Sequence, residues 1–289
     1  MNLAHRPNLR GITFMLGAVV AFSLMDVCLK LLSPHYPPMQ VAALRGLTSL
    51  PLVLVWIMLT GGFRQIMTRH WRLHLLRGVL AVLMMSAFVF ALRDLPLAEA
   101  YSLFFVAPLL VTALAVPLLG ERVGWRRWLA ILIGLCGVLV VLRPDTSRMF
   151  NLGSLAVLGA AIAYAFSAIT VRVLGRTEST QGMVFWVVSL LSAIATAAAW
   201  NEWVVVRFEH GPILLGLAVS GALGQYAITE AFKHSDASVV APFDYSALIW
   251  GITFDALIWH TEPDQMMLVG AAIIIASGLY LIRGENAPT

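Results

Sequence analysis

The sequence predicts an all-α integral membrane protein with ten transmembrane helices, arranged as two inverted five-helix repeats. Hydrophobic side chains make up 60% of the 289 residues and charged side chains only 12%, whereas roughly 25% of the residues in soluble domains are charged. The apolar residues form about ten runs, each near the roughly 20 residues that cross a bilayer as a helix. The two halves of the chain also match one another at a nearly constant offset.

The ten runs are continuously apolar rather than alternating with a period of two, which favours helices over a barrel. Turn-forming residues separate them, for example at Pro37-Pro38, Gly61-Gly62 and Gly211-Pro212. We therefore expect helices over residues 11–32, 38–59, 72–93, 96–119, 125–142, 152–174, 182–200, 211–232, 237–259 and 265–283.

Basic residues indicate the orientation, because short cytoplasmic loops retain Lys and Arg. With the N-terminus inside, the inner segments hold 13 basic residues, the outer segments hold 5, and Arg45 lies within a span. The inner group is Arg6, Arg10, Arg64, Arg69, Arg72, Arg77, Arg122, Arg126, Arg127, Arg172, Arg176, Lys233 and Arg283; the outer group is Lys30, Arg93, Arg143, Arg148 and Arg207. This split predicts a multi-pass protein of the cytoplasmic (inner) membrane with both termini in the cytoplasm, whose basic stretch from Arg64 to Arg77 contacts anionic lipid.

The internal match has an offset of 140 to 142 residues. It pairs Gly11 with Gly153, Gly17 with Gly159, Lys30 with Arg172, Arg93 with Lys233, Glu121 with Glu262, and Gly137 with Gly278. Because a unit of five spans is odd, the second copy enters the membrane in the opposite sense. We therefore expect one repeat over residues 1–145 and an inverted repeat over 146–289, around a site near the midplane that opens alternately to each side.

The ends of the two halves carry similar motifs. Residues 95–108 lead into Gly120-Glu121-Arg122 and then residues 137–144, while residues 237–245 are followed by Glu262 and Gly278. On these residues the chain resembles the drug/metabolite transporter superfamily in its ten-helix EamA-type form. The resemblance implies a secondary transporter of a small metabolite.

A second set of residues is similar to one branch of that superfamily, which contains S-adenosylmethionine transporter-like, riboflavin transporter-like and organic-anion carriers. The set comprises Met25-Asp26, Lys30, Arg45 and Leu76-Arg77-Gly78. The chain departs from the family pattern at His260-Thr261-Glu262, where Gly-Glu is usual, and at Asp255, where a small or apolar residue is usual.

Asp26 and Arg45 are charged residues inside adjacent predicted spans, and such residues normally face a cavity or a partner. Counted along helices that run in opposite directions, they lie about 9 and 10 Å from the outer ends of their spans. Asp26 also precedes Lys30 by four residues, which places both on one helical face. The sequence leaves two interpretations open: a substrate or proton site with Arg45 as an anion anchor, or a structural ion pair.

Polar residues enter the fourth and ninth spans from opposite sides of the membrane, as an inverted repeat requires. Tyr101 lies in the fourth span, and Asp244 and Tyr245 lie in the ninth. Burial disfavours the charged form of a carboxylate, so a buried carboxyl can be loaded and unloaded by a proton gradient. The candidates for proton coupling are Asp244 first, then Glu230, then Asp26.

Gln225, Tyr226 and Glu230 form a polar stripe on the eighth span, although Glu230 and Lys233 are also spaced to pair near the headgroups. Tyr164 and Trp250 lie near the midplane, where aromatic rings either stack on a planar substrate or take part in ordinary helix packing. The candidate substrate site therefore comprises Asp26, Arg45, Tyr101, Tyr164, Gln225, Tyr226, Tyr245 and Trp250. We expect Arg77 and Arg93 to extend outward from the third span rather than to bind substrate.

Motifs of soluble enzymes are missing from the sequence. It contains no His-Glu-x-x-His, no Gly-x-Ser-x-Gly and no Gly-x-x-x-x-Gly-Lys-Ser/Thr, and its seven histidines lack the spacing of metal ligands. We expect no cofactor, no metal and no nucleic-acid partner. The partners would be a zwitterionic or anionic metabolite, amino-acid-like or nucleoside-like, with protons or an exchanged solute and membrane lipid, in a monomer or homodimer.

Two other functions remain open at the level of sequence. One is a flippase of a lipid-linked substrate, and the other is an intramembrane enzyme that uses Asp244 and Asp255. Eleven residues along a helix separate these two carboxyls by about 16 Å, which is too far for a shared acid/base pair. The secondary transporter is therefore the leading hypothesis.

Overall fold

The computed structural model describes residues 7–93, 95, 97–142, 152–260 and 265–286, and all regular structure within them is helical. The α-helices are α1 (Pro7–Leu32), α2 (Pro38–Thr60), α3 (Trp71–Ala91), α4 (Leu97–Phe104), α5 (Ala107–Leu119), α6 (Trp125–Leu142), α7 (Leu152–Leu174), α8 (Thr180–Ala199), α9 (Gly211–His234), α10 (Ala237–Val240), α11 (Ala247–Trp259) and α12 (Gln265–Asn286). Short 3₁₀ helices are η2 (Phe63–Ile66), η3 (Trp200–Glu202), η4 (Phe208–His210) and η5 (Ala241–Ser246).

Most of the predicted spans have membrane-spanning length and hydropathy in the structure. Seven segments of the described chain are long and apolar enough to cross a bilayer: Leu9–Leu32, Pro38–Thr60, Trp71–Ala91, Leu152–Leu174, Thr180–Glu202, Phe208–His234 and Ala237–Trp259. Ala107–Leu119 and Leu268–Ser277 are shorter apolar helices. Every predicted span thus corresponds to helical structure, and the all-α membrane fold is confirmed.

The fourth and ninth spans depart from the prediction of continuous helices. The fourth is interrupted between α4 and α5, and the ninth consists of α10, η5 and α11. Pro108 and Pro242 each stand within the first two positions of the element after the interruption. Proline lacks a backbone N–H, and its ring clashes with the carbonyl four residues earlier, so it favours a break in an α-helix, although Pro51 lies inside the continuous helix α2.

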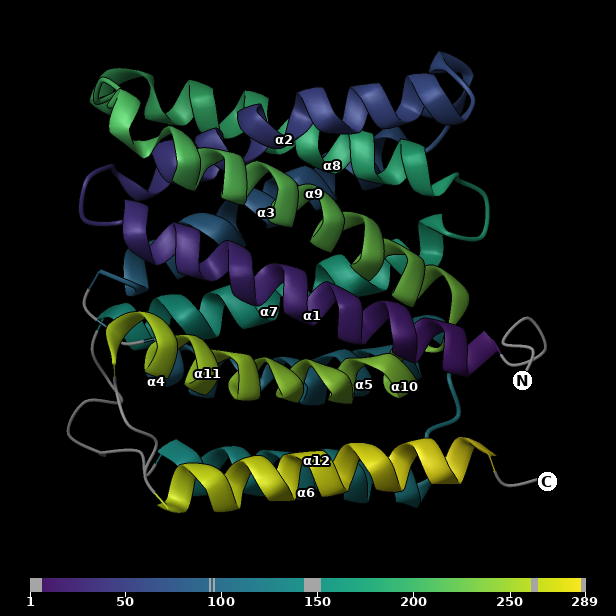
Figure 1. The fold of residues 1–289 in the computed structure, drawn as a ribbon. Helices are drawn as coiled ribbons and strands as arrows, with labels where there is room; N and C mark the ends of the chain where they lie inside the picture. The colour runs from purple at the N-terminus through teal and green to yellow at the C-terminus, as the bar shows by residue number, and fades with distance from the viewer. Residues whose placement is uncertain (1–6, 94, 96, 143–151, 261–264, 287–289) are drawn as a thin grey trace.

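The helices stack in successive pairs, with α2 and α8 at one edge of the bundle and α6 and α12 at the other (Figure 1). Helix α1 packs against α9, and α3 packs against α7. At the repeat offset, α1 corresponds to α7 and α3 corresponds to α9. Exchanging the two halves therefore turns the α1–α9 pair into the α7–α3 pair. Helices α2 with α8, and α6 with α12, pair across the same approximate two-fold relation.

Helix α1 begins and α12 ends at the same end of the bundle, which we call the terminal face (Figure 1). The repeats meet closely at α2 and α8: a Cβ on Gly46 would lie 2.5 Å from the Ser192 hydroxyl oxygen and 2.8 Å from its backbone nitrogen. Small residues allow this kind of backbone approach between membrane helices. The predicted boundary at residues 145 and 146 lies outside the described residues.

Candidate functional site

A central cavity lies between the two halves, with about 1050 Å³ of empty space including its mouth. Residues of both repeats line it, and the interrupted spans contribute Tyr101, Phe104, Phe105, Asp244 and Ala247. Substrate sites of inverted-repeat transporters typically form at such discontinuous helices near the midplane. The polar or charged side chains of its lining are Ser23, Asp26, Arg45, Arg77, Tyr101, Tyr164, Ser167, Gln225 and Asp244.

Asp26 of α1 and Tyr101 of α4 form one polar pair in this lining. The Tyr101 hydroxyl donates a hydrogen bond to an Asp26 carboxylate oxygen at 2.8 Å, and the Tyr101 ring stacks on Phe88. Lys30, which the helical spacing brings close to Asp26, instead contacts Asp255 of α11 at 3.8 Å. Asp26 therefore has a neutral partner rather than the neighbouring lysine.

Tyr164 of α7 and Asp244 of η5 form a second pair. The Tyr164 hydroxyl donates to an Asp244 carboxylate oxygen at 2.7 Å. Helix α7 is the counterpart of α1, and the ninth span is the counterpart of the fourth. Each repeat thus supplies one carboxyl–tyrosine pair between its first and fourth spans, but the carboxyl lies on the first span in one repeat and on the fourth in the other.

Arg45 of α2 is buried in the lining, with 4% of its surface exposed. Its Nε donates to the Met25 sulfur at 3.1 Å, and a terminal nitrogen donates to the Gln225 side-chain oxygen at 3.4 Å. No N–O distance of 4 Å or less joins it to Asp26 in the described part of the chain. The two residues share one cavity wall, as their predicted depths indicated, but they form no direct ion pair.

Arg77 lines the cavity, although the sequence analysis did not include it in the candidate site. We expected it to extend outward, but it is 1% exposed and lines the cavity. One terminal nitrogen donates to the Met183 carbonyl at 3.0 Å, and the other donates to the Thr229 hydroxyl at 3.3 Å. Two features of the sequence could have indicated this burial. Arg77 lies six residues into its helix, away from the helix end, and it precedes Gly78, where the absence of a side chain lets Leu190 of α8 pack closely.

Three of the predicted substrate residues lie away from the cavity lining. Tyr226 packs between Phe14 and Trp56, with ring centroids at 5.8 and 5.2 Å. Tyr245 is buried against Phe105. Trp250 has its ring 6.0 Å from that of Phe254 on its own helix, a contact of the ordinary packing kind that the sequence analysis left open for this residue.

Glu230, the second candidate for proton coupling, lies in a polar cluster at the terminal face rather than in the cavity lining. Its carboxylate accepts hydrogen bonds from Arg10 of α1 at 3.4 Å and from the Thr180 hydroxyl of α8. A His234 ring nitrogen lies 3.2 Å away. Because Arg10 belongs to the first repeat and the other two to the second, this carboxylate links the halves.

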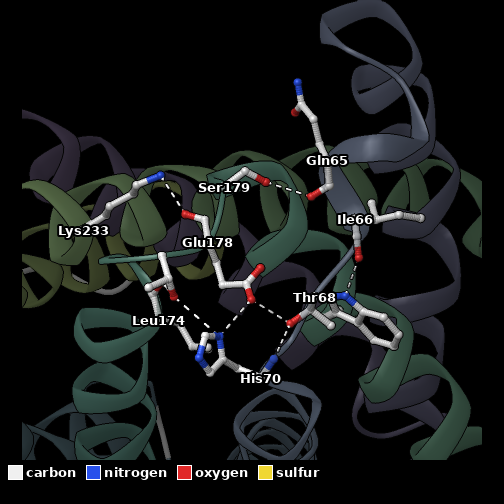
Figure 2. Close-up of polar contacts among 10 residues, drawn as sticks. Gln65, Ile66, Thr68, His70, Leu174, Glu178, Ser179 and Lys233 are labelled. Atoms are coloured by element: carbon white, nitrogen blue, oxygen red, sulfur yellow. Dashed lines mark hydrogen bonds and ion pairs between the residues drawn. The ribbon is translucent and has the colours of Figure 1, made fainter.

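A second cross-repeat contact joins the segment before α3 to the linker between α7 and α8 (Figure 2). Glu178 accepts a hydrogen bond from the Thr68 hydroxyl at 2.7 Å, and it lies 3.2 Å from a His70 ring nitrogen. Ser179 donates to the Gln65 carbonyl at 2.8 Å. Lys233 of α9 donates to the Glu178 carbonyl at 3.1 Å. We call this cluster of residues 65–70, 178–179 and 233 the terminal latch.

The electrostatics of the latch favour a charged Glu178. Burial raises the pKa of its carboxyl, but the hydrogen bonds from Thr68 and His70 and the nearby His74 outweigh burial, so the pKa lies below its usual value. A carboxyl whose pKa is depressed by folding stabilises the folded contact above its unfolded pKa, and this contribution is lost as the pH falls through the lowered pKa. The contribution of the charged Glu178 to the latch is therefore present at neutral pH.

The opposite face carries its own cross-repeat contacts. The Tyr36 hydroxyl lies 2.8 Å from a His210 ring nitrogen and accepts from the Arg207 backbone N–H at 3.0 Å. Gln40 exchanges two hydrogen bonds with the backbone of Val204. Polar contacts between the repeats thus lie at both ends of the molecule, with the cavity between them.

The two halves have opposite orientation, and the interrupted helices border a cavity that is lined by apolar and charged side chains and lies between the cross-repeat contacts. These are features of a membrane transporter. A model of the EamA-like transporter family matches the chain twice, over residues 9–143 and 151–283. The chain belongs to this family, as the sequence motifs indicated.

Curated relatives match almost the whole chain. A riboflavin transporter of Vibrio cholerae is 30% identical over 293 residues, covering 99% of this chain and 97% of the relative. An S-adenosylmethionine uptake transporter of Rickettsia prowazekii is 30% identical over 286 residues, with coverage of 99% and 97%. A pseudopaline exporter of Pseudomonas aeruginosa is 24% identical over 277 residues, with coverage of 96% and 97%.

A solved crystal structure shares the fold, with a TM-score of 0.79 at 17% sequence identity. The superposition covers 96% of this chain and 99% of the other. Family and relatives together assign the chain to the metabolite transporters.

Proposed function

We propose that this protein is a secondary active transporter that moves a small zwitterionic or anionic metabolite by alternating access. The observation that carries the proposal is the cavity between the repeats, where Asp26 and Arg45 supply charges of both signs. Asp244 supplies a further carboxyl on the interrupted ninth span. A zwitterion presents its carboxylate to a guanidinium and its ammonium to a carboxylate. The test is uptake by proteoliposomes of compounds that stabilise the purified protein in a thermal-shift screen.

The polar contacts between the repeats would act as the two gates of this cycle. The terminal latch and Glu230 close the terminal face, and Tyr36, Gln40 and their partners close the opposite face. Both sets are formed in this structure, so rocking of one repeat against the other would break one set of contacts while the other set stays intact. Protons or an exchanged solute would drive the cycle, with Asp244 as the first candidate for proton loading.

Replacing Glu178 with glutamine is expected to open the terminal face more often. A cysteine placed at Val171, which lines the cavity near that face, reports this opening in a background carrying Cys28→Ser and Cys136→Ser. Loss of about 1 kcal/mol of hydrogen bonding predicts a roughly fivefold rise in the population of the open state. Labelling of the cysteine by an impermeant maleimide in inside-out vesicles should accelerate accordingly.

Glu209→Gln is the matched control for this experiment, because Glu209 is exposed at the opposite face. It should leave the labelling rate at Val171→Cys unchanged. Equal labelling rates in wild type and Glu178→Gln would show that the latch does not hold the terminal face closed.

We further propose that the protein lies in the cytoplasmic membrane with both termini inside, in contact with anionic lipid and as a monomer or homodimer. The repeats would divide near residue 145. This orientation places the latch on the cytoplasmic side. Its support is the excess of basic residues in the segments at the terminal face, since such residues are retained in the cytoplasm.

Two single cysteines test this orientation in the same cysteine-free background. Met67 is 77% exposed within the latch segment, and Phe208 is fully exposed at the opposite face. In intact cells, an impermeant maleimide should label Phe208→Cys but should label Met67→Cys only after permeabilisation. Labelling of Met67→Cys from outside intact cells would overturn the orientation.

A further inference from the structure

We infer that Arg45 and Arg77 together form an anion site along α9, which takes a carboxylate or phosphate group of the transported molecule. The inference rests on the proposed transport function and adds a second guanidinium, on α3, to the anchor that Arg45 provides on α2. If the inference is right, the transported molecule carries an anionic group.

The two arginines, on α2 and α3, hydrogen-bond to side chains on successive turns of α9. Arg45 donates to the Gln225 side chain, and Arg77 donates to the Thr229 hydroxyl. Thr229 in turn donates to the Gln225 backbone carbonyl at 2.7 Å. Four residues along α9 correspond to a rise of about 6 Å, so the groups that hold the two guanidiniums are one turn apart on one face.

The positive charge of the two guanidiniums is not balanced by direct contact. Their hydrogen-bond acceptors are the Met25 sulfur, the Gln225 amide, the Met183 carbonyl and the Thr229 hydroxyl. Within the described ranges, no carboxylate oxygen lies within 4 Å of either. The carboxyls of the lining, Asp26 and Asp244, already accept from tyrosines.

Arg77 also has unused hydrogen-bonding capacity. Its Nε is buried and has no hydrogen-bond partner, although the side chain lines the cavity. Arginine presents a rigid planar fork of donors that matches carboxylate and phosphate. A buried cation with only neutral partners is costly to keep, and an anionic substrate group supplies the missing charge while it is bound.

The test measures binding by the purified full-length protein in detergent. Thermal shifts are recorded with a panel of small metabolites that contains monoanions, dianions, zwitterions, cations and neutral amide analogues of the same size. In the wild type, compounds with a carboxylate or phosphate should raise the melting temperature, and their neutral analogues should not. Loss of charge-assisted hydrogen bonds in Arg77→Gln should weaken the affinity of the stabilising anions by about 10- to 100-fold.

Two further variants separate binding from folding. Arg72→Gln removes an exposed guanidinium from the same helix and should bind the anions as the wild type does. Arg77→Lys keeps the charge without the fork and should bind with an intermediate affinity.

Several results would overturn the inference: stabilisation by cations or neutral compounds alone, no stabilising anion in the panel, or full anion affinity in Arg77→Gln. Liposome uptake of a stabilising anion separates this inference from the proposed function. Binding through Arg77 without uptake leaves the anion site standing and contradicts transport. Uptake that is equal in Arg77→Gln and wild type supports transport and contradicts the anion site.

Discussion

Replacing Asp244 with asparagine is expected to abolish accumulation driven by a proton gradient while leaving solute exchange intact. Asp244 lies in η5, at the interruption of the ninth span, and it lines the cavity. Its carboxylate accepts a hydrogen bond from Tyr164 and forms no ion pair within the described chain. No basic partner therefore holds it in the charged form, and in the proposed cycle it would take up a proton on one side of the membrane and release it on the other.

The measurement is uptake by proteoliposomes with an imposed pH difference. For a carrier that couples one proton to each solute, a difference of one pH unit is equivalent to about 1.4 kcal/mol, or roughly tenfold accumulation. Asp244→Asn should show no accumulation but normal counterflow. Asp255→Asn is the matched control, because Asp255 lies on the same span outside the cavity lining and should still accumulate solute. Full accumulation by Asp244→Asn would remove this residue from coupling.

Arg45→Gln is expected to reduce transport by about 10- to 100-fold, the effect of losing charge-assisted hydrogen bonds to a buried anionic group. The guanidinium is buried at the cavity wall, and Gln225 and Met25 position it. Asp26→Asn should also impair transport, since Asp26 lines the same cavity. Initial rates in liposomes measure both effects, and Arg64→Gln, on an exposed residue, is the control.

The structure also predicts the transport activity of a double variant in which the charges of Asp26 and Arg45 are exchanged. Because Asp26 and Arg45 form no direct ion pair, exchanging the two charges in Asp26→Arg/Arg45→Asp should not restore transport. Recovery of activity in the exchanged variant would show that the pair is structural. Normal transport by both single variants would show that this part of the cavity is not the substrate site.

The fold was predictable because its determinants are patterns in the sequence itself rather than contacts between particular side chains. Apolar run length, turn residues and the repeat offset are each visible in the chain. The interruptions near Pro108 and Pro242 were not predicted, because hydropathy treats these spans as continuous and a proline alone does not mark a break: Pro51 lies inside the continuous helix α2. The predicted helix ends differ from the observed ones by a few residues, as between 211–232 and Gly211–His234.

The candidate site was predictable in part, because sequence gives the depth of a residue better than it gives the direction of its side chain. Asp26, Arg45, Tyr101, Tyr164, Gln225 and Asp244 all line the cavity. Tyr226 sits one residue after Gln225, about 100° around the helix, and so faces other helices. Arg77 was missed because the packing of α3 against α7 and α8, which turns it inward, depends on residues far away in the chain.

Counterflow in proteoliposomes tests the central claim most directly. Vesicles are loaded with an unlabelled compound that stabilises the protein, and labelled compound is then added outside without any ion gradient. Alternating access predicts that the internal compound accelerates uptake of the label several-fold, and that the label recovered inside is chemically unchanged. Uptake that is unaffected by internal compound, or label recovered in an altered form, would contradict the account.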